Sequence, residues 1–276
     1  MTILLTGIST GIGRATAEKL LAAGHTIFGS TRKVEDFAEL AAHANFTGLV
    51  FDVTDRAAIQ AGIAKIKTAG PLHAVVNNAG IAVTGPLETL AEDQYRKQFE
   101  VNVFGALAVA QEALPLLHAA RESGQTNVKI INVSSVSGYL SSPFTSIYSA
   151  SKFAIEAITD GMRRELMPFG IDVISIAPGP VKTPIWGKGK LQTAAYEDNR
   201  YSGMLARLDT YTENANAGGL EPAVVAAAIL KALEDHRPRP DQLIMKRGWM
   251  AKLVLRLPKR LQDKLIRRNL DRDRRY

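Results

Sequence analysis

Short apolar segments alternate with stretches of helical periodicity along most of the 276-residue chain. Strand patterns occupy residues 2–6, 25–30, 46–53, 72–77, 128–133, 171–177 and 241–245. Helical patterns occupy residues 11–23, 34–43, 56–68, 92–121 (which includes Pro115), 146–166 and 221–234. This alternation predicts an α/β fold in which about seven strands form one doubly wound parallel sheet with helices on both faces. We expect residues 1–276 to form a single domain.

The composition excludes several kinds of chemistry. The chain has no cysteine, which excludes disulfides, thiolate metal sites and a cysteine nucleophile. Its five histidines are scattered without ligand spacing, so we expect no metal site. No apolar run reaches the ~18 residues of a membrane-spanning helix. The first strand pattern begins at Thr2, which leaves no room for a signal peptide, so we expect a cytoplasmic protein.

Three glycines join the first strand pattern to the first helix in the order Gly7-x3-Gly11-x-Gly13. Glycines in a strand–turn–helix context let the backbone approach a pyrophosphate, which the helix N-terminus then attracts. Residues 7–11 (Gly-Ile-Ser-Thr-Gly) also match the G-x-S-x-G pattern of serine hydrolases. That alternative needs a later acid and histidine. His236 is the only histidine late enough, and no acidic residue marks a partner strand.

Basic residues follow the second strand pattern, where a dinucleotide-binding fold distinguishes its cofactors. An acid at that position binds the ribose hydroxyl of NAD, whereas a cation accommodates the 2′-phosphate of NADP. Thr31 is not acidic, and Arg32 and Lys33 are basic. The sequence therefore favours NADP, with a solvent-exposed surface arginine as the alternative.

Polar or glycine-containing segments also follow the later strand patterns. They are residues 52–53 (Asp-Val), 77–80 (Asn-Asn-Ala-Gly) and 178–183 (Pro-Gly-Pro-Val-Lys-Thr). Ligands of open parallel sheets bind beyond the carboxyl ends of the strands, so we expect these segments to contact one. Asn102 lies inside an apolar helical pattern, where a buried amide needs partners and can be purely structural.

Tyr148 and Lys152 are four residues apart on the helix predicted to begin at Ser146, so they share one helix face. A free tyrosine titrates near pH ~10, and a nearby cation lowers that pKa toward the range useful for proton transfer. Ser135 lies thirteen residues before the tyrosine. The pair alone also fits an ordinary solvated helix face, so its weight depends on the other motifs.

Together these residues resemble the short-chain dehydrogenase/reductase family, in family order and with family spacing over roughly the first 185 residues. The matching motifs are Thr6-Gly7-x3-Gly11-x-Gly13, Asn77-Asn78-Ala79-Gly80, Asn102, Ser135, Tyr148-x3-Lys152 and Pro178-Gly179-x3-Thr183. Residues 85–88, 151–154 and 178–181 are similar to the 17β-hydroxysteroid and retinol dehydrogenase branch. The resemblance implies a Rossmann-like fold.

The resemblance also implies a role for each motif. Tyr148 would be the general acid in carbonyl reduction, Lys152 would lower its pKa and hold the nicotinamide ribose, and Ser135 would bind the substrate oxygen. Asn102 would support a proton-relay water. The implied cofactor contacts are Gly7, Ser9, Thr10, Gly11, Ile12 and Gly13 at the pyrophosphate, Arg32 at the 2′-phosphate, Asp52 and Val53 at the adenine, Asn78, Ala79 and Gly80 at the ribose, and Val181 and Thr183 at the nicotinamide, beside Pro178 and Gly179.

Residues 182–219 are where the resemblance places a substrate lid, with short helical patterns at 192–196 and 203–208. Loops of this length in compact domains are usually functional or mobile. Four large apolar residues there could line a wall for a lipophilic substrate or pack the lid onto the core. They are Trp186, Leu191, Met204 and Leu208.

The net charge of +7 is concentrated at the C-terminus, where residues 246–276 contain twelve Lys or Arg and three Asp or Glu. Pro258 divides this segment into two short basic amphipathic helical patterns. Such helices can lie on an anionic membrane surface or pack against the domain or a partner subunit, and the lack of a second anchor favours packing. We expect no nucleic-acid binding, because no recognition motif accompanies the charge.

The sequence thus predicts an NADP(H)-dependent oxidoreductase that interconverts a carbonyl and an alcohol, with NADPH preferred over NADH. We expect a hydrophobic small-molecule substrate such as a steroid, retinoid or other bulky ketone or aldehyde, and a homo-oligomer. One alternative is a non-catalytic NADP-binding regulator on the same fold, although the complete Ser/Tyr/Lys set argues against it. The other is a serine hydrolase with Ser9 as its nucleophile.

Overall fold

The computed structural model describes residues 1–185, 201, 217–246 and 248–270. Seven parallel strands form one sheet in the order β3-β2-β1-β4-β5-β6-β7. The strands are β1 (Thr2–Thr6), β2 (Thr26–Thr31), β3 (Phe46–Val50), β4 (Ala74–Asn77), β5 (Val128–Val133), β6 (Ile171–Pro178) and β7 (Asp241–Ile244). The predicted doubly wound parallel α/β sheet is confirmed.

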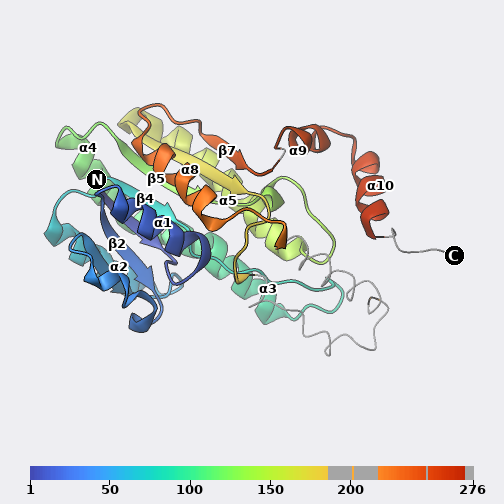
Figure 1. Cartoon of the computed structure of the whole chain (residues 1–276), viewed down its shortest axis with the longest axis horizontal. Helices are drawn as coiled ribbons and strands as arrows, with labels where there is room; N and C mark the ends of the chain where they lie inside the picture. The colour runs from blue at the N-terminus through green and yellow to red at the C-terminus, as the bar shows by residue number, and fades with distance from the viewer. Residues whose placement is uncertain (186–200, 202–216, 247, 271–276) are drawn as a thin grey trace.

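Helices cover both faces of this sheet (Figure 1). The α-helices of the described residues are α1 (Gly11–Ala22), α2 (Arg56–Ala69), α3 (Glu92–Phe99), α4 (Ala106–Glu122), α5 (Ser146–Leu166), α8 (Pro222–Glu234), α9 (Gly248–Leu255) and α10 (Lys259–Leu270), of which α9 and α10 lie beyond the end of the sheet. Helices α1 and α8 pack on one face, whereas α2, α4 and α5 pack on the other. Each face therefore has its own hydrophobic cluster.

The central strands are apolar throughout because both of their faces are buried. Successive side chains of a strand point to opposite faces, so in β1 Ile3 and Leu5 join the cluster under α1 and α8, while Leu4 joins the other. All three are 0% exposed. Complete burial on both faces fixes the register of β1 in the centre of the sheet.

Two sequence predictions differ locally from the structure. Residues 34–43, predicted as a helix, form two 3₁₀ turns, Val34–Phe37 and Leu40–Ala42. Phe37 and Leu40 are both buried and lie three residues apart, the spacing that a 3₁₀ turn places on one face. The strand predicted over 46–53 ends at Val50, because Asp52 turns the chain by accepting hydrogen bonds from the amide and hydroxyl of Thr54.

The helical stretch predicted over 92–121 is continuous from Glu92 to Glu122 and contains Pro115, as expected. Residues Glu100–Gly105 form a π-helical segment between α3 and α4. We expected no apolar run long enough to span a membrane. The helical stretch Glu92–Glu122, however, is long and apolar enough on average to span a bilayer. Its buried side chains, such as Val109 and Leu117, pack in the core against the sheet, as expected for a core helix.

A buried lysine joins the sheet to α8. Lys129 of β5 is 0% exposed, and its Nζ donates hydrogen bonds to the carbonyls of Ala232 and Leu233 at 2.9 Å each, and to that of Asp235. Burial lowers the pKa of this ammonium, while the charges of Asp172 and Asp235 oppose the shift. The cation therefore caps the carbonyls that the C-terminus of α8 leaves unpaired.

Candidate active site

A cavity of about 1070 Å³ opens at the carboxyl edge of the sheet. It is lined by all the residues predicted to bind a cofactor and by three of the four predicted catalytic residues. They are Gly7, Ser9, Thr10, Gly11, Ile12, Gly13, Arg32, Asp52, Val53, Asn78, Ala79, Gly80, Ser135, Tyr148, Lys152, Pro178, Gly179, Val181 and Thr183. Asn102 lies behind this lining.

The glycine loop is built for close backbone approach. Gly7 has φ 72°, and a Cβ there would lie 2.7 Å from the Cα of Ala79. A Cβ on Gly13 would overlap the carbonyl oxygen of Gly7. Thr10, the N-cap of α1, makes no side-chain cap hydrogen bond, so the first amides of the helix are left for another acceptor. These features and the volume of the cavity fit the pyrophosphate of a dinucleotide.

Thr6 and Asn78 join the glycine loop to the loop after β4. The hydroxyl of Thr6 accepts hydrogen bonds from the amides of Asn78 and Ala79, each at 3.0 Å. The Asn78 side chain in turn donates to the carbonyls of Thr6 and Gly7, each at 3.0 Å. This reciprocal set holds two walls of the cavity at a fixed separation.

Asn102 and Gln98 support the next wall from behind. Asn102 accepts a hydrogen bond from the Ile81 amide at 2.9 Å and donates to the Ile81 carbonyl at 3.0 Å. Gln98 also donates to the Ile81 carbonyl, and it accepts from the Val83 amide at 2.6 Å. Both amides also approach the hydroxyl of Ser151. The structure thus places Asn102 as a positioning residue, and its role in holding a relay water stays a prediction.

Tyr148 lies at the floor of the cavity with 5% of its surface exposed. Burial raises the pKa of its phenol, and a hydrogen bond with the Ser135 side chain opposes that rise. Lys152 Nζ lies 5.9 Å from the ring centroid, and the expectation that its charge favours the phenolate stays a prediction. Burial is the larger of the two effects on the Tyr148 pKa, so the phenol is protonated at neutral pH.

Lys152 is held by the backbone of β5. Its Nζ donates a hydrogen bond to the Val133 carbonyl at 2.9 Å. Burial lowers the pKa of this ammonium to about 8, and the negative charge of Glu156 opposes the shift. Glu156 lies one turn further along α5, so Tyr148, Lys152 and Glu156 share one helix face.

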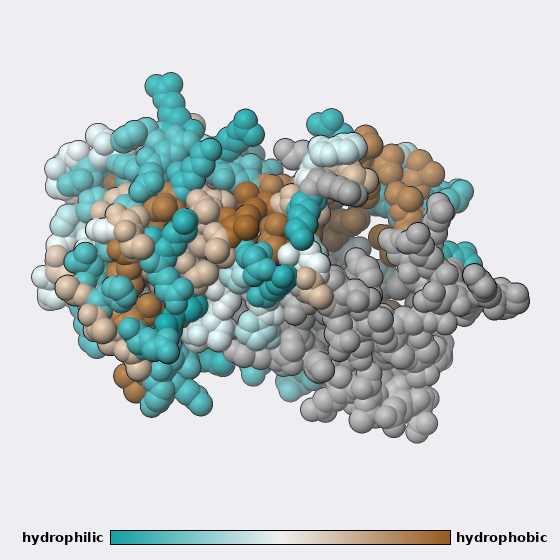
Figure 2. Space-filling model, in the orientation of Figure 1, coloured by the Kyte–Doolittle hydropathy of each residue, from teal (hydrophilic) through white to brown (hydrophobic). Residues whose placement is uncertain are grey.

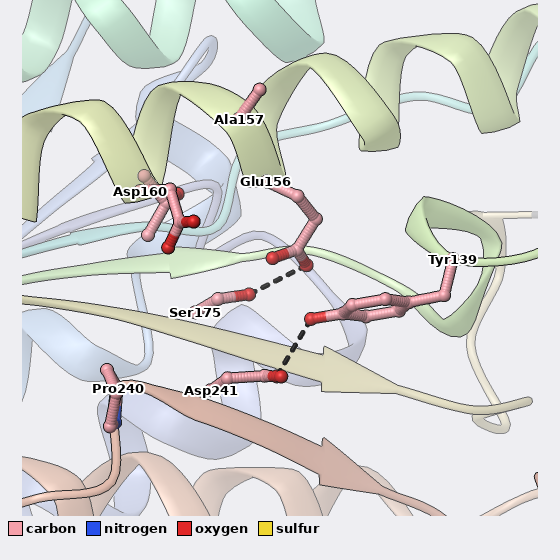
Figure 3. Close-up of a pocket in the computed structure, with 8 residues that line it drawn as sticks. Tyr139, Glu156, Ala157, Asp160, Ser175, Pro240 and Asp241 are labelled. Atoms are coloured by element: carbon pink, nitrogen blue, oxygen red, sulfur yellow. Dashed lines mark hydrogen bonds between the residues drawn. The ribbon is translucent and has the colours of Figure 1, made fainter. Parts of the chain in front are cut away.

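Glu156 is itself fixed in a small pocket of about 200 Å³ between α5, β6 and β7 (Figure 3). The Ser175 hydroxyl donates to Glu156 at 2.7 Å, and the Tyr139 hydroxyl donates to Asp241 at 2.8 Å. Burial raises the pKa of Tyr139, and the bond to Asp241 adds to the rise, so this phenol stays protonated. The pocket holds a carboxylate in place one turn from Lys152.

The far end of the cavity carries both signs of charge. Arg32, after β2, is exposed and lines the cavity, whereas Lys33 lies outside the lining. The Thr31 hydroxyl donates to the Lys33 carbonyl at 2.6 Å, which turns the chain after the strand. Asp36 also lines the cavity. The cation predicted to bind a 2′-phosphate therefore faces the cavity.

The ends of the predicted lid lie at the edge of the cavity. Val181 and Leu220 form a β-bridge, with the Lys182 amide donating to the Leu220 carbonyl at 2.9 Å. Within the segment, Tyr201 donates to Glu88 at 2.8 Å and contacts the ring of Phe144. The helical patterns at 192–196 and 203–208, and the four apolar residues Trp186, Leu191, Met204 and Leu208, lie outside the described residues.

The serine hydrolase alternative finds no histidine partner for Ser9. Among the described residues that line the cavity there is no histidine, so Ser9 has no imidazole base there. His236 follows α8 at the start of the connection to β7. Each strand in a parallel sheet runs toward the carboxyl edge, so the start of β7 is at the opposite edge from Ser9.

Sequence reasoning missed the residues that act from behind the cavity. They are Gln98, Ser151 and Glu156, which lie on predicted helices, where a polar residue usually indicates a solvent-exposed position. A detectable signal was the pair Gln98 and Asn102, two amides one turn apart that are both buried. The pairing of Glu156 with Ser175 joins two distant elements, and neither residue alone indicates it.

The sheet, the uncapped glycine loop at the end of β1 and the Ser/Tyr/Lys group in one cavity define a dinucleotide-dependent oxidoreductase. The family model described as short chain dehydrogenase matches residues 1–193. The chain belongs to the short-chain dehydrogenase family and is an NAD(P)-dependent enzyme that acts on carbonyl groups.

Two bacterial reductases are similar in sequence. An NADPH-dependent 3-dehydrocapnine reductase of Ornithobacterium rhinotracheale is 39% identical, covering 97% of this chain and 96% of its own length. A 3-ketodihydrosphingosine reductase of Bacteroides thetaiotaomicron is 31% identical, covering 86% of this chain and 84% of its own. Neither is a steroid or retinol dehydrogenase, so the finer resemblance to that branch finds no support in them.

Two solved structures share the fold. A short-chain dehydrogenase from Streptomyces avermitilis has a TM-score of 0.77 and 30% identity, covering 100% of this chain and 98% of its own. A short-chain dehydrogenase/reductase from Burkholderia phymatum in complex with NAD has a TM-score of 0.79 and 26% identity, covering 96% of this chain and 94% of its own.

Proposed function

We propose that this enzyme is an NADPH-dependent reductase of a lipophilic ketone with a long alkyl chain. The observation that carries the reaction class is the buried Tyr148, which lines the cavity and is hydrogen-bonded to the Ser135 side chain. Its protonated phenol can donate the proton that reduction of a carbonyl requires.

The residues at the floor of the cavity divide the chemistry among them. A bound nicotinamide cofactor would supply the hydride. Tyr148 donates its proton to the carbonyl oxygen as negative charge develops there, and Ser135 donates a hydrogen bond to the same oxygen. The Lys152 ammonium, fixed on the Val133 carbonyl, stabilises the phenolate that remains.

The preference for NADPH rests on Arg32. Its exposed guanidinium lines the cavity after β2, where a cation accommodates a 2′-phosphate. Asp36 faces the same region and could favour a ribose hydroxyl, so the two residues act in opposite directions. Support for NADPH comes from the similar reductase of Ornithobacterium rhinotracheale, which is named as NADPH-dependent.

The substrate class rests on the names of the two similar reductases. Both substrates carry an oxidised third carbon, and dihydrosphingosine is a long-chain lipid base. The cavity of about 1070 Å³ is large enough for a dinucleotide and part of a second molecule. We therefore place a long-chain 3-ketone ahead of a steroid or a retinoid.

A substrate panel tests this proposal. NADPH oxidation is followed with 3-ketodihydrosphingosine in detergent micelles, a steroid ketone and a short polar ketone at matched carbonyl concentrations. We expect kcat/KM to be highest for the long-chain ketone. Turnover of the short polar ketone alone would refute the lipophilic substrate, and the same rates with NADH as with NADPH would refute the cofactor preference.

A further inference from the structure

The two C-terminal helices expose a row of large apolar side chains. On α9 Trp249 is 69% exposed, Met250 43% and Leu253 59%, and on α10 Leu261 is 45% exposed and Leu265 42%. Hydrophobic side chains gather over α9 and α10 at the end of the molecule away from the N-terminus (Figures 1 and 2). Trp249 and Met250 lie four and three residues before Leu253, and Leu261 lies four before Leu265, spacings that put them on one side of each helix.

Exposed cations lie beside this apolar row. Residues 248–270 contain seven Lys or Arg and one Asp. The five whose side chains are described as exposed are Arg256, Lys259, Arg260, Lys264 and Arg267. An apolar face flanked by basic residues on short helices is the pattern of helices that lie in the interface of an anionic membrane.

Helices α9 and α10 are joined by hydrogen bonds into one unit, the C-terminal helix pair (residues 248–270). Gln262 of α10 is 4% exposed, and its side-chain amide donates to the carbonyls of Val254 at 3.2 Å and Leu257 at 2.9 Å. These carbonyls belong to the end of α9 and to the turn that follows it. Gln262 thereby joins the two helices, and their apolar residues belong to one structural unit.

The C-terminal helix pair follows β7 at the carboxyl edge of the sheet, the edge where the cavity opens. Helix α9 begins four residues after β7 ends. Met245, between them, packs on Gly179, where an added Cβ would lie 2.8 Å from the Met245 Cβ, and Gly179 lines the cavity. Lys246 donates to the Gly218 carbonyl at 2.8 Å, close to the end of the predicted lid.

We propose that α9 and α10 dock the protein on an anionic phospholipid bilayer, with Trp249, Met250, Leu253, Leu261 and Leu265 in the interface and the flanking cations on the lipid headgroups. A second copy of the chain is the competing occupant. A symmetric contact through this patch would bring the basic side chains of both copies close together, whereas anionic lipid neutralises them. Charge complementarity therefore selects the bilayer.

Vesicle flotation with the full-length protein tests the docking. Vesicles of phosphatidylcholine with phosphatidylglycerol should carry the protein upward, and vesicles of phosphatidylcholine alone should carry much less. Leu253→Asp with Leu265→Asp should reduce the bound fraction about tenfold or more, since both changes put charge into the apolar interface. Met167→Asp is the matched control, because Met167 is 67% exposed but lies at the opposite edge of the sheet.

Tryptophan fluorescence gives a second readout. The chain has two tryptophans, Trp186 and Trp249, so Trp186→Phe leaves Trp249 as the sole reporter. Its emission should shift to shorter wavelength when anionic vesicles are added, and the shift should shrink at high salt. The proposal is overturned if the protein neither floats nor shifts. It is also overturned if Leu253→Asp with Leu265→Asp dissolves an oligomer in sedimentation while vesicle binding is unchanged.

Docking would bring the mouth of the cavity to a bilayer that holds the substrate, a consequence that rests on the proposed function. The Leu253→Asp, Leu265→Asp variant should then lose activity on a long-chain ketone in anionic vesicles and keep it in micelles. If wild type reduces the ketone in micelles but does not bind vesicles, docking fails alone. If it binds vesicles but reduces no lipid ketone, the proposed function fails alone.

Discussion

Burial and neighbouring side chains act in opposite directions on the pKa values of Tyr148 and Lys152 in the cavity. Burial raises the pKa of Tyr148 and lowers that of Lys152, so each residue is held nearer its neutral form than in water. Ser135 and Glu156 oppose these two shifts. At neutral pH the phenol keeps its proton, and most Lys152 side chains, with a pKa of about 8, remain charged.

The first prediction concerns pH. Reduction should slow as the pH rises past about 8, because Lys152 then loses the charge that stabilises the phenolate. The charge of Glu156 raises the Lys152 pKa, so Glu156→Gln should move this alkaline limb to lower pH. The pH dependence of kcat/KM measures the shift. Asp160→Asn, one turn further along α5, is the control, and a limb that does not move in Glu156→Gln would contradict the assignment.

The second prediction concerns the cofactor. Arg32→Ala should raise the KM for NADPH by about 10–100-fold, the effect of losing a hydrogen bond to a charged group, and leave the KM for NADH almost unchanged. Lys33→Ala is matched in charge, but Lys33 lies outside the cavity lining, so it should change neither value. Equal effects of the two substitutions would show that only the overall charge of this surface matters.

At the scale of elements, the glycine loop has the tightest geometry in the site. Gly13→Ala places a methyl group into the carbonyl of Gly7 and beside the Asn78 side chain, so the start of α1 must move. We expect a loss of stability of about 1–3 kcal/mol, as for overpacked sites, together with loss of NADPH binding.

A second glycine provides the control for this third prediction. A Cβ on Gly161 of α5 would meet no atom within 4 Å, so Gly161→Ala should stabilise the protein by about 0.5–1 kcal/mol. Denaturant unfolding measured with and without NADPH compares the two variants. If Gly13→Ala were as stable as wild type and responded to NADPH as wild type does, the packing argument would be wrong.

Elements whose sequence shows one strong period could be predicted closely. The bounds of β5 and α5 are those expected. β5 is a short, mostly apolar run, and α5 is a long amphipathic helix with a clear helical period. The conformation of residues 34–43 could not be predicted from the sequence. Their 3₁₀ turns depend on Phe37 packing beside Gly48, a contact between segments that are apart in the sequence. The π-helical segment around Asn102 likewise follows from the hydrogen bonds to Ile81.

At the scale of the whole molecule, the order of strands brings together residues that are far apart in the sequence. Four parts of the site each follow a different strand: the glycine loop, the loop that contains Asn78, Ser135 and Thr183. Because parallel strands end at one edge of the sheet, their meeting in one cavity was predictable. The distances were not. That Lys152 bonds to the Val133 carbonyl and stays 5.9 Å from the Tyr148 ring depends on how α5 packs on β5.

The measurement that tests the central claim most directly compares wild type with Tyr148→Phe in NADPH oxidation, on a ketone that the wild type reduces. NADPH affinity is titrated in parallel. Because only the phenolic hydroxyl is removed, we predict a fall in kcat of about 10²–10⁴-fold, the usual contribution of a general acid, with NADPH binding almost unchanged. A variant that binds NADPH and keeps most of the wild-type rate would show that Tyr148 is not the proton donor.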